Sequence, residues 1–152
     1  MIHIPNYTFT NLVQINKGWS ADKKYCATDN DGIKYFLRTS TPERYERRKS
    51  IYEITKRAMQ LDITVNQPID FGKYENGVYT LFDWIDGEDL KTVLPSLTET
   101  EQYKLGFEAG EILQKIHEVE ILVGIEQKLD SACRIVVYGF CDLNCHCAHF
   151  FS

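Results

Sequence analysis

The sequence has little of what would place a protein in a membrane or on nucleic acid. None of its apolar runs approaches the roughly 20 residues needed to cross a bilayer. The formal net charge is -5, so the basic excess of a typical nucleic-acid binder is missing. The opening "MIHIPNYTFT" has neither a basic start nor an apolar stretch, so no signal peptide is predicted. We expect a cytoplasmic protein with no nucleic-acid or membrane partner.

Internal repeats are absent, and the five cysteines are too few and too uneven for a disulfide framework. Cys26 stands alone in a predicted strand. The others gather near the C-terminus with two histidines: Cys133, Cys141, Cys145, Cys147, His146 and His149. The spacing C-x3-C-x-C does not match the two separated pairs of a usual structural zinc site. A metal site in this tail stays open as a less favoured alternative.

What is present fits one α+β domain with a substantial core. The chain has 152 residues, of which 43% are hydrophobic and 26% charged. Three strands are predicted first, over Asn11–Asn16, Lys23–Thr28 and Ile33–Thr39. The last two are joined by "DNDG", Asp29–Gly32, because an Asp-Gly pair tolerates the positive φ of a tight turn.

The segment from Ile15 to Ser40 allows two interpretations. It has a tight turn before its hairpin and an arginine near its end, and such a turn can point several amide donors at one anion. The alternative is an ordinary hairpin, because the full G-x-G-x-x-G of protein kinases is absent. Strand alternation places the side chains of the third strand on two faces: Tyr35 and Leu37 on one, Phe36 and Arg38 on the other.

A helix is predicted after the third strand. Thr41 is placed to cap it, with Pro42 at the first helical position. Apolar residues recur at helical spacing: Ile51, Ile54, Ala58 and Leu61. The opposite face is polar: Lys49, Glu53, Lys56 and Gln60.

The next elements are a second hairpin and a second helix. Asn76-Gly77 joins predicted strands at Ile69–Tyr74 and Val78–Trp84. A polar linker, "DGEDLKTVLPSL", follows. Thr98 and Glu101 then form a capping box for a helix, with an apolar stripe of Leu105, Ala109, Ile112, Leu113 and Ile116.

Five motifs in this order resemble the aminoglycoside phosphotransferase family, which has a protein-kinase-like fold. They are "GWSAD", "KYFLR", "PIDFG", "YTLFDWIDGEDL" and "AGEILQKIHEV". The match covers about Val13 to Val119. It implies an α+β small lobe, in which an antiparallel five-stranded sheet carries one packed helix, followed by a linker and one or more helices.

The resemblance also implies a division of the chain. Residues 1–85 would be the nucleotide-binding lobe, residues 86–120 the hinge with the first helix of the catalytic lobe, and residues 121–152 an atypical tail. The family's H-G-D-x-x-x-x-N catalytic loop does not occur; "YGFCDLNCHC" has Asp142 and Asn144 without the required spacing. We therefore assign no catalytic residue and no metal ligand, and expect a truncated or frameshifted lobe.

The resemblance places the nucleotide phosphates at the first turn and the third strand. Gly18, Trp19 and Ser20 occupy the turn that covers the phosphates in the family. Arg38 stands where such kinases carry a lysine that grips them. Arginine is permanently charged and bidentate toward phosphate, so it can keep this role.

The resemblance assigns three further positions. Glu53 is the candidate partner of the strand cation on the following helix, with Ile51 as the alternative occupant of that position. In the hinge, the Asp83 carbonyl would accept from the exocyclic amine of adenine, and the Ile85 N–H would donate to the ring.

The implied activity is that of a small-molecule kinase. The complete enzyme would use ATP or GTP with Mg²⁺ to move the γ-phosphoryl group to a hydroxyl of a small-molecule acceptor such as an aminoglycoside. A non-catalytic α+β module that binds a nucleotide or a protein is the alternative. An uncovered lobe interface would also favour self-association.

Overall fold

The computed structural model describes residues 2–17, 20–61, 66–88 and 90–117. The chain forms two compact units. The first comprises Met1–Lys56 with Asn66–Trp84, and the second comprises Arg57–Val65 with Ile85–Ser152. None of the described helices is long and apolar enough to span a membrane.

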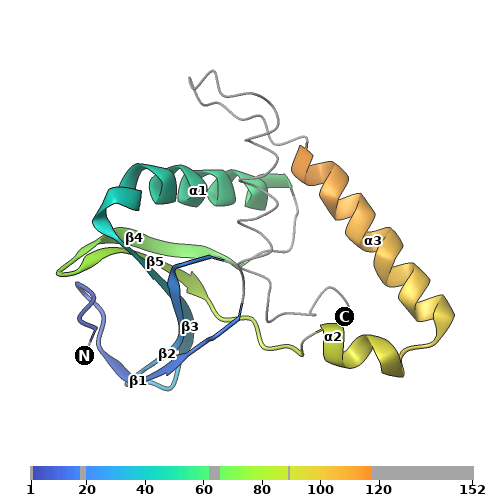
Figure 1. Cartoon of the computed structure of the whole chain (residues 1–152), viewed down its shortest axis with the longest axis horizontal. Helices are drawn as coiled ribbons and strands as arrows, with labels where there is room; N and C mark the ends of the chain where they lie inside the picture. The colour runs from blue at the N-terminus through green and yellow to red at the C-terminus, as the bar shows by residue number, and fades with distance from the viewer. Residues whose placement is uncertain (1, 18–19, 62–65, 89, 118–152) are drawn as a thin grey trace. The chain divides into compact units, whose positions relative to one another are not determined.

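The first unit is built on one antiparallel sheet. Its strands are β1 (Phe9–Gln14), β2 (Lys23–Asp29), β3 (Lys34–Ser40), β4 (Pro68–Tyr74) and β5 (Gly77–Asp83). Their spatial order is β1-β2-β3-β5-β4, and every neighbouring pair is antiparallel (Figure 1). All five predicted strands are therefore confirmed, with ends that differ by one or two residues. The expected α+β fold with a five-stranded sheet is confirmed as well.

Both predicted hairpin turns form. In the β2–β3 turn the N–H groups of Asp31 and Ile33 each donate to the Asp29 carboxylate at 2.9 Å. Gly32 has a φ of +81°, which favours glycine over other residues. In the β4–β5 turn a Cβ on Gly77 would lie 2.1 Å from the carbonyl oxygen of Ser40, so only glycine fits there.

The helix after β3 begins differently from the prediction. A 3-10 turn over Pro42–Arg44 precedes α1 (Tyr45–Ala58). The Thr41 side chain makes no capping hydrogen bond; instead its carbonyl accepts the Arg44 N–H at 3.1 Å. The predicted faces of the helix are confirmed, because Ile51 and Ile54 are buried whereas Glu53 is exposed.

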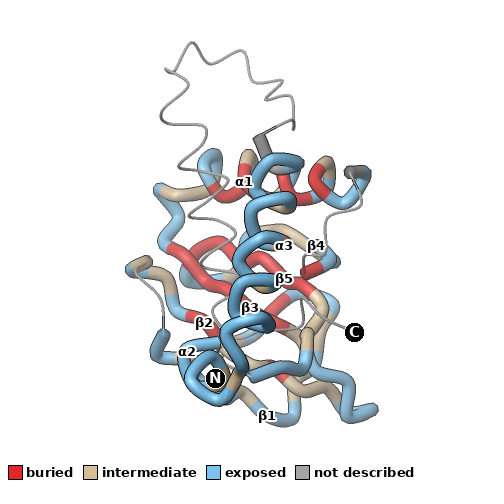
Figure 2. The backbone as a smooth tube through the Cα atoms, turned by 90° about the vertical axis from the view of Figure 1, so that its right-hand side faces the viewer, coloured by how far each residue is buried: buried red, intermediate tan, exposed pale blue. Residues whose placement is uncertain are grey.

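The two faces of the sheet carry different residues. One face holds a core cluster of Ile4, Ala27, Leu37, Tyr79 and Leu81, with Tyr35 packed against it. The other face carries Phe36 and Arg38, whose guanidinium lies 5.9 Å from the centre of the Phe36 ring. The predicted alternation along β3 is therefore confirmed. Figure 2 shows buried residues along β3 and β5 and at intervals along α1.

Aromatic contacts join α1 to β4. The Phe71 ring lies 5.2 Å from that of Tyr45 and 5.6 Å from that of Tyr52, between ring centres. The helix therefore covers the sheet face on which Phe71 lies. Figure 1 shows α1 lying over the sheet.

The second unit contains α2 (Leu90–Val93) and α3 (Glu99–His117). The predicted capping box forms at the start of α3. The Thr98 N–H donates to the Glu101 carboxylate at 2.7 Å, and the Glu101 N–H donates to the Thr98 hydroxyl at 3.3 Å. Two aromatic side chains of α3 are well exposed, Tyr103 at 77% and Phe107 at 58%. The predicted tail, 121–152, lies outside the described residues.

Candidate functional site

A row of polar and aromatic residues crosses the sheet on the face that α1 covers. Lys24 pairs with Arg38 between β2 and β3, Arg38 with Thr80 between β3 and β5, and Thr80 with Phe71 between β5 and β4. Residues directly opposite in an antiparallel sheet share a face. Lys24 and Arg38 are each only 2% exposed, so two cations lie side by side in a largely buried position.

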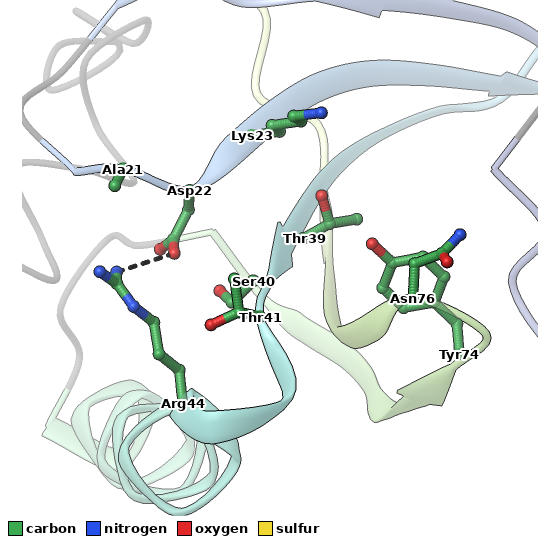
Figure 3. A pocket seen from close by; sticks show the side chains of 9 residues that line it. All are labelled: Ala21, Asp22, Lys23, Thr39, Ser40, Thr41, Arg44, Tyr74 and Asn76. Carbon is green, nitrogen blue, oxygen red and sulfur yellow. Dashed lines mark hydrogen bonds and ion pairs between the residues drawn. The ribbon is translucent and has the colours of Figure 1, made fainter.

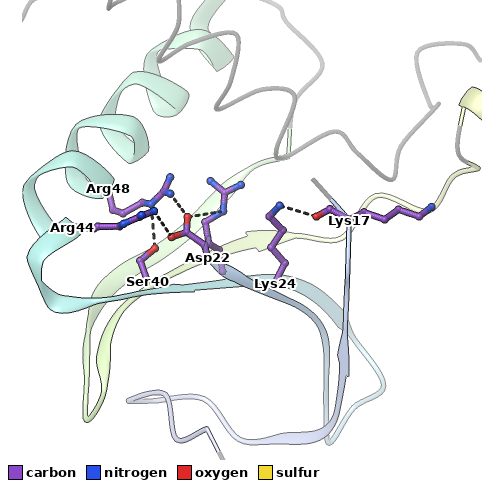
Figure 4. Close-up of polar contacts among 7 residues, drawn as sticks. Lys17, Asp22, Lys24, Ser40, Arg44 and Arg48 are labelled. Atoms are coloured by element: carbon purple, nitrogen blue, oxygen red, sulfur yellow. Dashed lines mark hydrogen bonds and ion pairs between the residues drawn. The ribbon is translucent and has the colours of Figure 1, made fainter. Parts of the chain in front are cut away.

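Asp22 supplies the negative charge next to this row. It comes just before β2, and its side chain is 1% exposed. The Arg44 Nη1 donates to one carboxylate oxygen at 3.1 Å, and the Arg48 Nη2 donates to the other. The Arg38 Nε lies 4.0 Å from the oxygen that Arg48 contacts. Figure 4 shows Arg44 and Arg48 directed at this carboxylate.

Arg48 connects helix α1 to both the sheet and the turn. Its Nε donates to the Ser40 hydroxyl at 3.1 Å, in addition to its contact with Asp22. The pKa of Arg48 is lowered to about 10, mainly by burial and then by the neighbouring charge of Arg38, while the carboxylate of Asp22 opposes both effects. The guanidinium is nevertheless charged at neutral pH.

The turn between β1 and β2 is held from its other side by Lys24. The Lys24 Nζ donates to the carbonyl of Lys17 at 2.8 Å, as Figure 4 shows. At the far end of the turn, the Ser20 hydroxyl is buried and has no hydrogen-bond partner within the described ranges. A buried hydroxyl in that state is ready to bond a ligand or water. Gly18 and Trp19 lie outside the described residues.

The structure does not bring Glu53 to Arg38. The Glu53 side chain is 51% exposed, and its carboxylate lies 4.0 Å from the ammonium of Lys56 on the same helix. Ile51, the alternative occupant, is buried. The Arg38 Nε instead lies 4.0 Å from the carboxylate of Asp22, on the turn.

Asp83, the candidate adenine contact, lies at the end of β5. Its carbonyl accepts a hydrogen bond from Asn66 Nδ2 at 3.0 Å, and a carbonyl oxygen has a second lone pair for another donor. The Asp83 carboxylate accepts the Gln67 N–H. Burial raises the pKa of Asp83 and outweighs the effect of that hydrogen bond. Ile85 belongs to the second unit.

A pocket opens beside Asp22 (Figure 3). Its volume is about 270 Å³. Basic, hydroxyl and amide groups dominate its lining: Ala21, Asp22, Lys23, Thr39, Ser40, Thr41, Arg44, Tyr74 and Asn76. Asp22 and the groups around it (Arg38, Ser40, Arg44 and Arg48) form a charged cluster. The pocket shares Asp22, Ser40 and Arg44 with this cluster.

The sequence reasoning missed Asp22, Arg44 and Arg48. Asp22 is the last residue of the "GWSAD" motif, but nothing local shows that it meets a helix. Arg48 could have been found, because it lies three residues before Ile51 and so on the buried face of the predicted helix. A charge at such a position indicates a buried partner.

The described residues offer no ready magnesium site. Within 2–17, 20–61, 66–88 and 90–117, no group of three or more His, Cys, Asp and Glu side chains could hold a metal ion. The donors that converge in the cluster are mainly cationic, which suits an anion rather than Mg²⁺.

The fold is an antiparallel five-stranded sheet with a covering helix, and one face of the sheet carries the buried cations Lys24 and Arg38. The model of the phosphotransferase enzyme family matches residues 11–128, which is well over half of the chain. The chain therefore belongs to the phosphotransferase enzyme family. No curated protein matches the chain.

Proposed function

We propose that this chain is the nucleotide-binding part of a small-molecule kinase that uses ATP or GTP. The observation that carries the proposal is the buried pair of Arg38 and Lys24 beside the β1–β2 turn. Membership of the phosphotransferase enzyme family supports it. Residues 1–85 would be the nucleotide-binding lobe, and residues 86–120 the linker with the first helix of the next lobe.

The site suits phosphate because of its charge and its low exposure to water. A guanidinium offers two parallel N–H donors to a phosphate group, and such bonds are stronger away from solvent. The buried Ser20 hydroxyl adds a donor at the turn. Phosphoryl transfer depends on positioning and charge stabilisation, and Arg38 with the turn would supply part of both.

Adenine would bind through the backbone at the end of β5. The Asp83 carbonyl would accept from the exocyclic amine with its second lone pair, and the Ile85 N–H would donate to the ring. Side-chain identity matters little for such contacts, so ATP and GTP are both retained as candidates.

Magnesium and the transfer step would need groups other than those described. The described residues supply no cluster of acidic ligands. The family's catalytic loop also does not occur in the sequence. We therefore propose that the acceptor, a small-molecule hydroxyl, and the metal bind in the complete enzyme. An open lobe surface would favour self-association of this chain alone.

Calorimetric titration of ATP into the purified chain tests the proposal. Ser20→Ala and Arg38→Ala should each weaken ATP binding, because each removes a phosphate ligand. Arg47→Ala is the matched control, since Arg47 is an exposed arginine of α1. A parent chain that binds neither ATP nor GTP, or Ser20→Ala and Arg38→Ala variants that bind like the parent, would contradict the proposal.

A further inference from the structure

Asp22 is the carboxylate on which cations from three other elements converge. Its contacts are Arg44 in the 3-10 turn, Arg48 in α1 and Arg38 in β3, with the last at 4.0 Å. The Asp22 side chain is 1% exposed, that of Arg38 2% and that of Arg48 6%. The pairs with Arg38 and Arg48 are thus shielded from solvent, unlike surface pairs, which contribute little, whereas the Arg44 side chain is 36% exposed.

The residues that precede the same turn are also held by hydrogen bonds. Lys24 donates to the Lys17 carbonyl at 2.8 Å, and the Ile15 N–H donates to the Lys24 carbonyl at 2.8 Å. Lys24 is the cross-strand neighbour of Arg38. One polar contact on each side, at Lys17 and at Asp22, therefore fixes the described ends of the turn beside β2 and β3.

We propose that Asp22 is the positioning residue of the candidate phosphate site, an inference that rests on the function proposed above. Its carboxylate holds the β1–β2 turn and the Arg38 guanidinium in one arrangement, and Arg48 anchors that arrangement to α1. Because bidentate binding of phosphate depends on the plane of the guanidinium, an oriented arginine binds with less loss of entropy than a mobile one.

In this arrangement the carboxylate that faces Arg38 is that of Asp22, on the β1–β2 turn. Helix α1 contributes a second cation, Arg48. The exposed Glu53 lies 4.0 Å from Lys56, whereas the buried charged side chain of α1 is that of Arg48. A helix carboxylate that orients Arg38 is the rival arrangement. The first arrangement predicts that Asp22→Asn weakens ATP binding more than Glu53→Gln does, and the rival arrangement predicts the reverse.

The test is a titration of ATP into full-length parent, Asp22→Asn, Asp22→Glu and Glu53→Gln proteins. We expect Asp22→Asn to weaken ATP binding by roughly tenfold or more, and Glu53→Gln to change it by less than about twofold. Asp22→Glu keeps the charge and should retain part of the affinity. Asp31→Asn is the matched control, since it removes the same charge from an exposed turn.

Amide hydrogen exchange without nucleotide gives a second measurement. Asp22→Asn should speed exchange at residues 20–24, where the turn meets β2, and Glu53→Gln should not. A purely structural role would lower the melting temperature and leave the ATP affinity of the folded variant unchanged, which would overturn the inference. If Asp22→Asn does not fold, Asp22→Glu decides: affinity equal to the parent's contradicts the inference, and a loss larger than that of Glu53→Gln supports it.

The outcomes separate this inference from the proposed function. A larger loss of affinity in Glu53→Gln than in Asp22→Asn would overturn the inference alone, because the parent would still bind ATP. A parent that binds no nucleotide would overturn both.

Discussion

Arg48 places a permanent charge on the buried side of α1. A buried cation is costly unless it is paired and hydrogen-bonded, and Arg48 meets both conditions through Asp22 and Ser40. The same side chain thereby joins the helix to the end of β3 and to the β1–β2 turn. Removing the Arg48 side chain should lower both the stability of the fold and the affinity for nucleotide.

Arg48→Met should lower the free energy of unfolding by about 2 kcal/mol, the scale of a lost charged hydrogen bond. Larger losses follow when a buried ion is left alone, but Asp22 would keep Arg44 and Arg38. Urea denaturation measures the difference. Arg47→Met, on the exposed side of the helix, should stay within about 0.5 kcal/mol of the parent. Equal effects of the two substitutions would show that the contacts of Arg48 contribute nothing.

The direction of Arg38 was predictable, but its partner was not. Strand alternation alone places Arg38 opposite to Leu37, because side chains alternate with a period of two. The partner Asp22 lies in a turn that meets α1 only in the folded unit. Glu53 was the expected partner because it shares the right helix, yet helical periodicity already placed it on the polar face.

At the scale of elements, the two hairpins depend on their turns. Gly77 allows the β4–β5 turn to lie against the end of β3, where the Ser40 carbonyl leaves no room for a Cβ. Strands and turns were predictable because Asp-Gly and Asn-Gly pairs act locally. The start of α1 was harder to predict, because Pro42 suits the first turn of a 3-10 helix as well as that of an α-helix.

Gly77→Ala should destabilise the first unit by about 1–3 kcal/mol, the usual cost of overpacking. The clash at 2.1 Å is with backbone, which cannot rotate away. Gly106→Ala is the control in α3, where a Cβ meets nothing within 4 Å among the described residues; it should stabilise the helix by about 0.5–1 kcal/mol. Thermal melts of both variants measure the effects. A neutral Gly77→Ala would contradict the close approach.

Asp29 gives the β2–β3 turn a dependence on acid pH. Burial alone would raise the pKa of Asp29, but hydrogen bonds from the Ile33 N–H, the Tyr35 hydroxyl and the Asp31 N–H lower it overall. A carboxyl group with a lowered pKa stabilises the fold above its unfolded-state pKa, and this contribution is lost as pH falls through the folded-state value.

We therefore expect the parent to lose stability as pH falls below about 4. Asp29→Asn should be less stable than the parent at pH 7, and the gap should narrow at pH 2. Melting temperatures across this range provide the measurement, with Asp31→Asn as control because its side chain accepts none of these bonds. A gap that is unchanged between pH 7 and pH 2 would contradict the role of the Asp29 carboxylate.

At the scale of the whole molecule, the chain combines a charged sheet face with no recognisable catalytic loop. Its phosphotransferase family was predictable because five short motifs occur in the right order. Asp22, the counterion of the site, could not be predicted, because its role depends on contacts between segments that are distant in the sequence. Binding of a nucleotide and transfer of its phosphate are therefore tested separately.

The purified chain should transfer no phosphate from ATP to aminoglycosides or simple alcohols. The transfer step needs a residue that orients the hydroxyl and acidic ligands for Mg²⁺. Asp142 is the tail aspartate closest to an asparagine, but its spacing does not fit a catalytic loop. Radiolabel transfer measures turnover. Turnover that Asp142→Asn abolishes would make the tail a catalytic loop and contradict this expectation.

The most direct test of the account compares ATP with adenosine by calorimetry, for the parent and for Arg38→Ala. If the buried cations hold phosphate, the parent binds ATP more tightly than adenosine, and Arg38→Ala removes most of that difference while adenosine affinity stays the same. Equal affinity of the parent for ATP and adenosine, or a difference that survives in Arg38→Ala, would contradict the central claim.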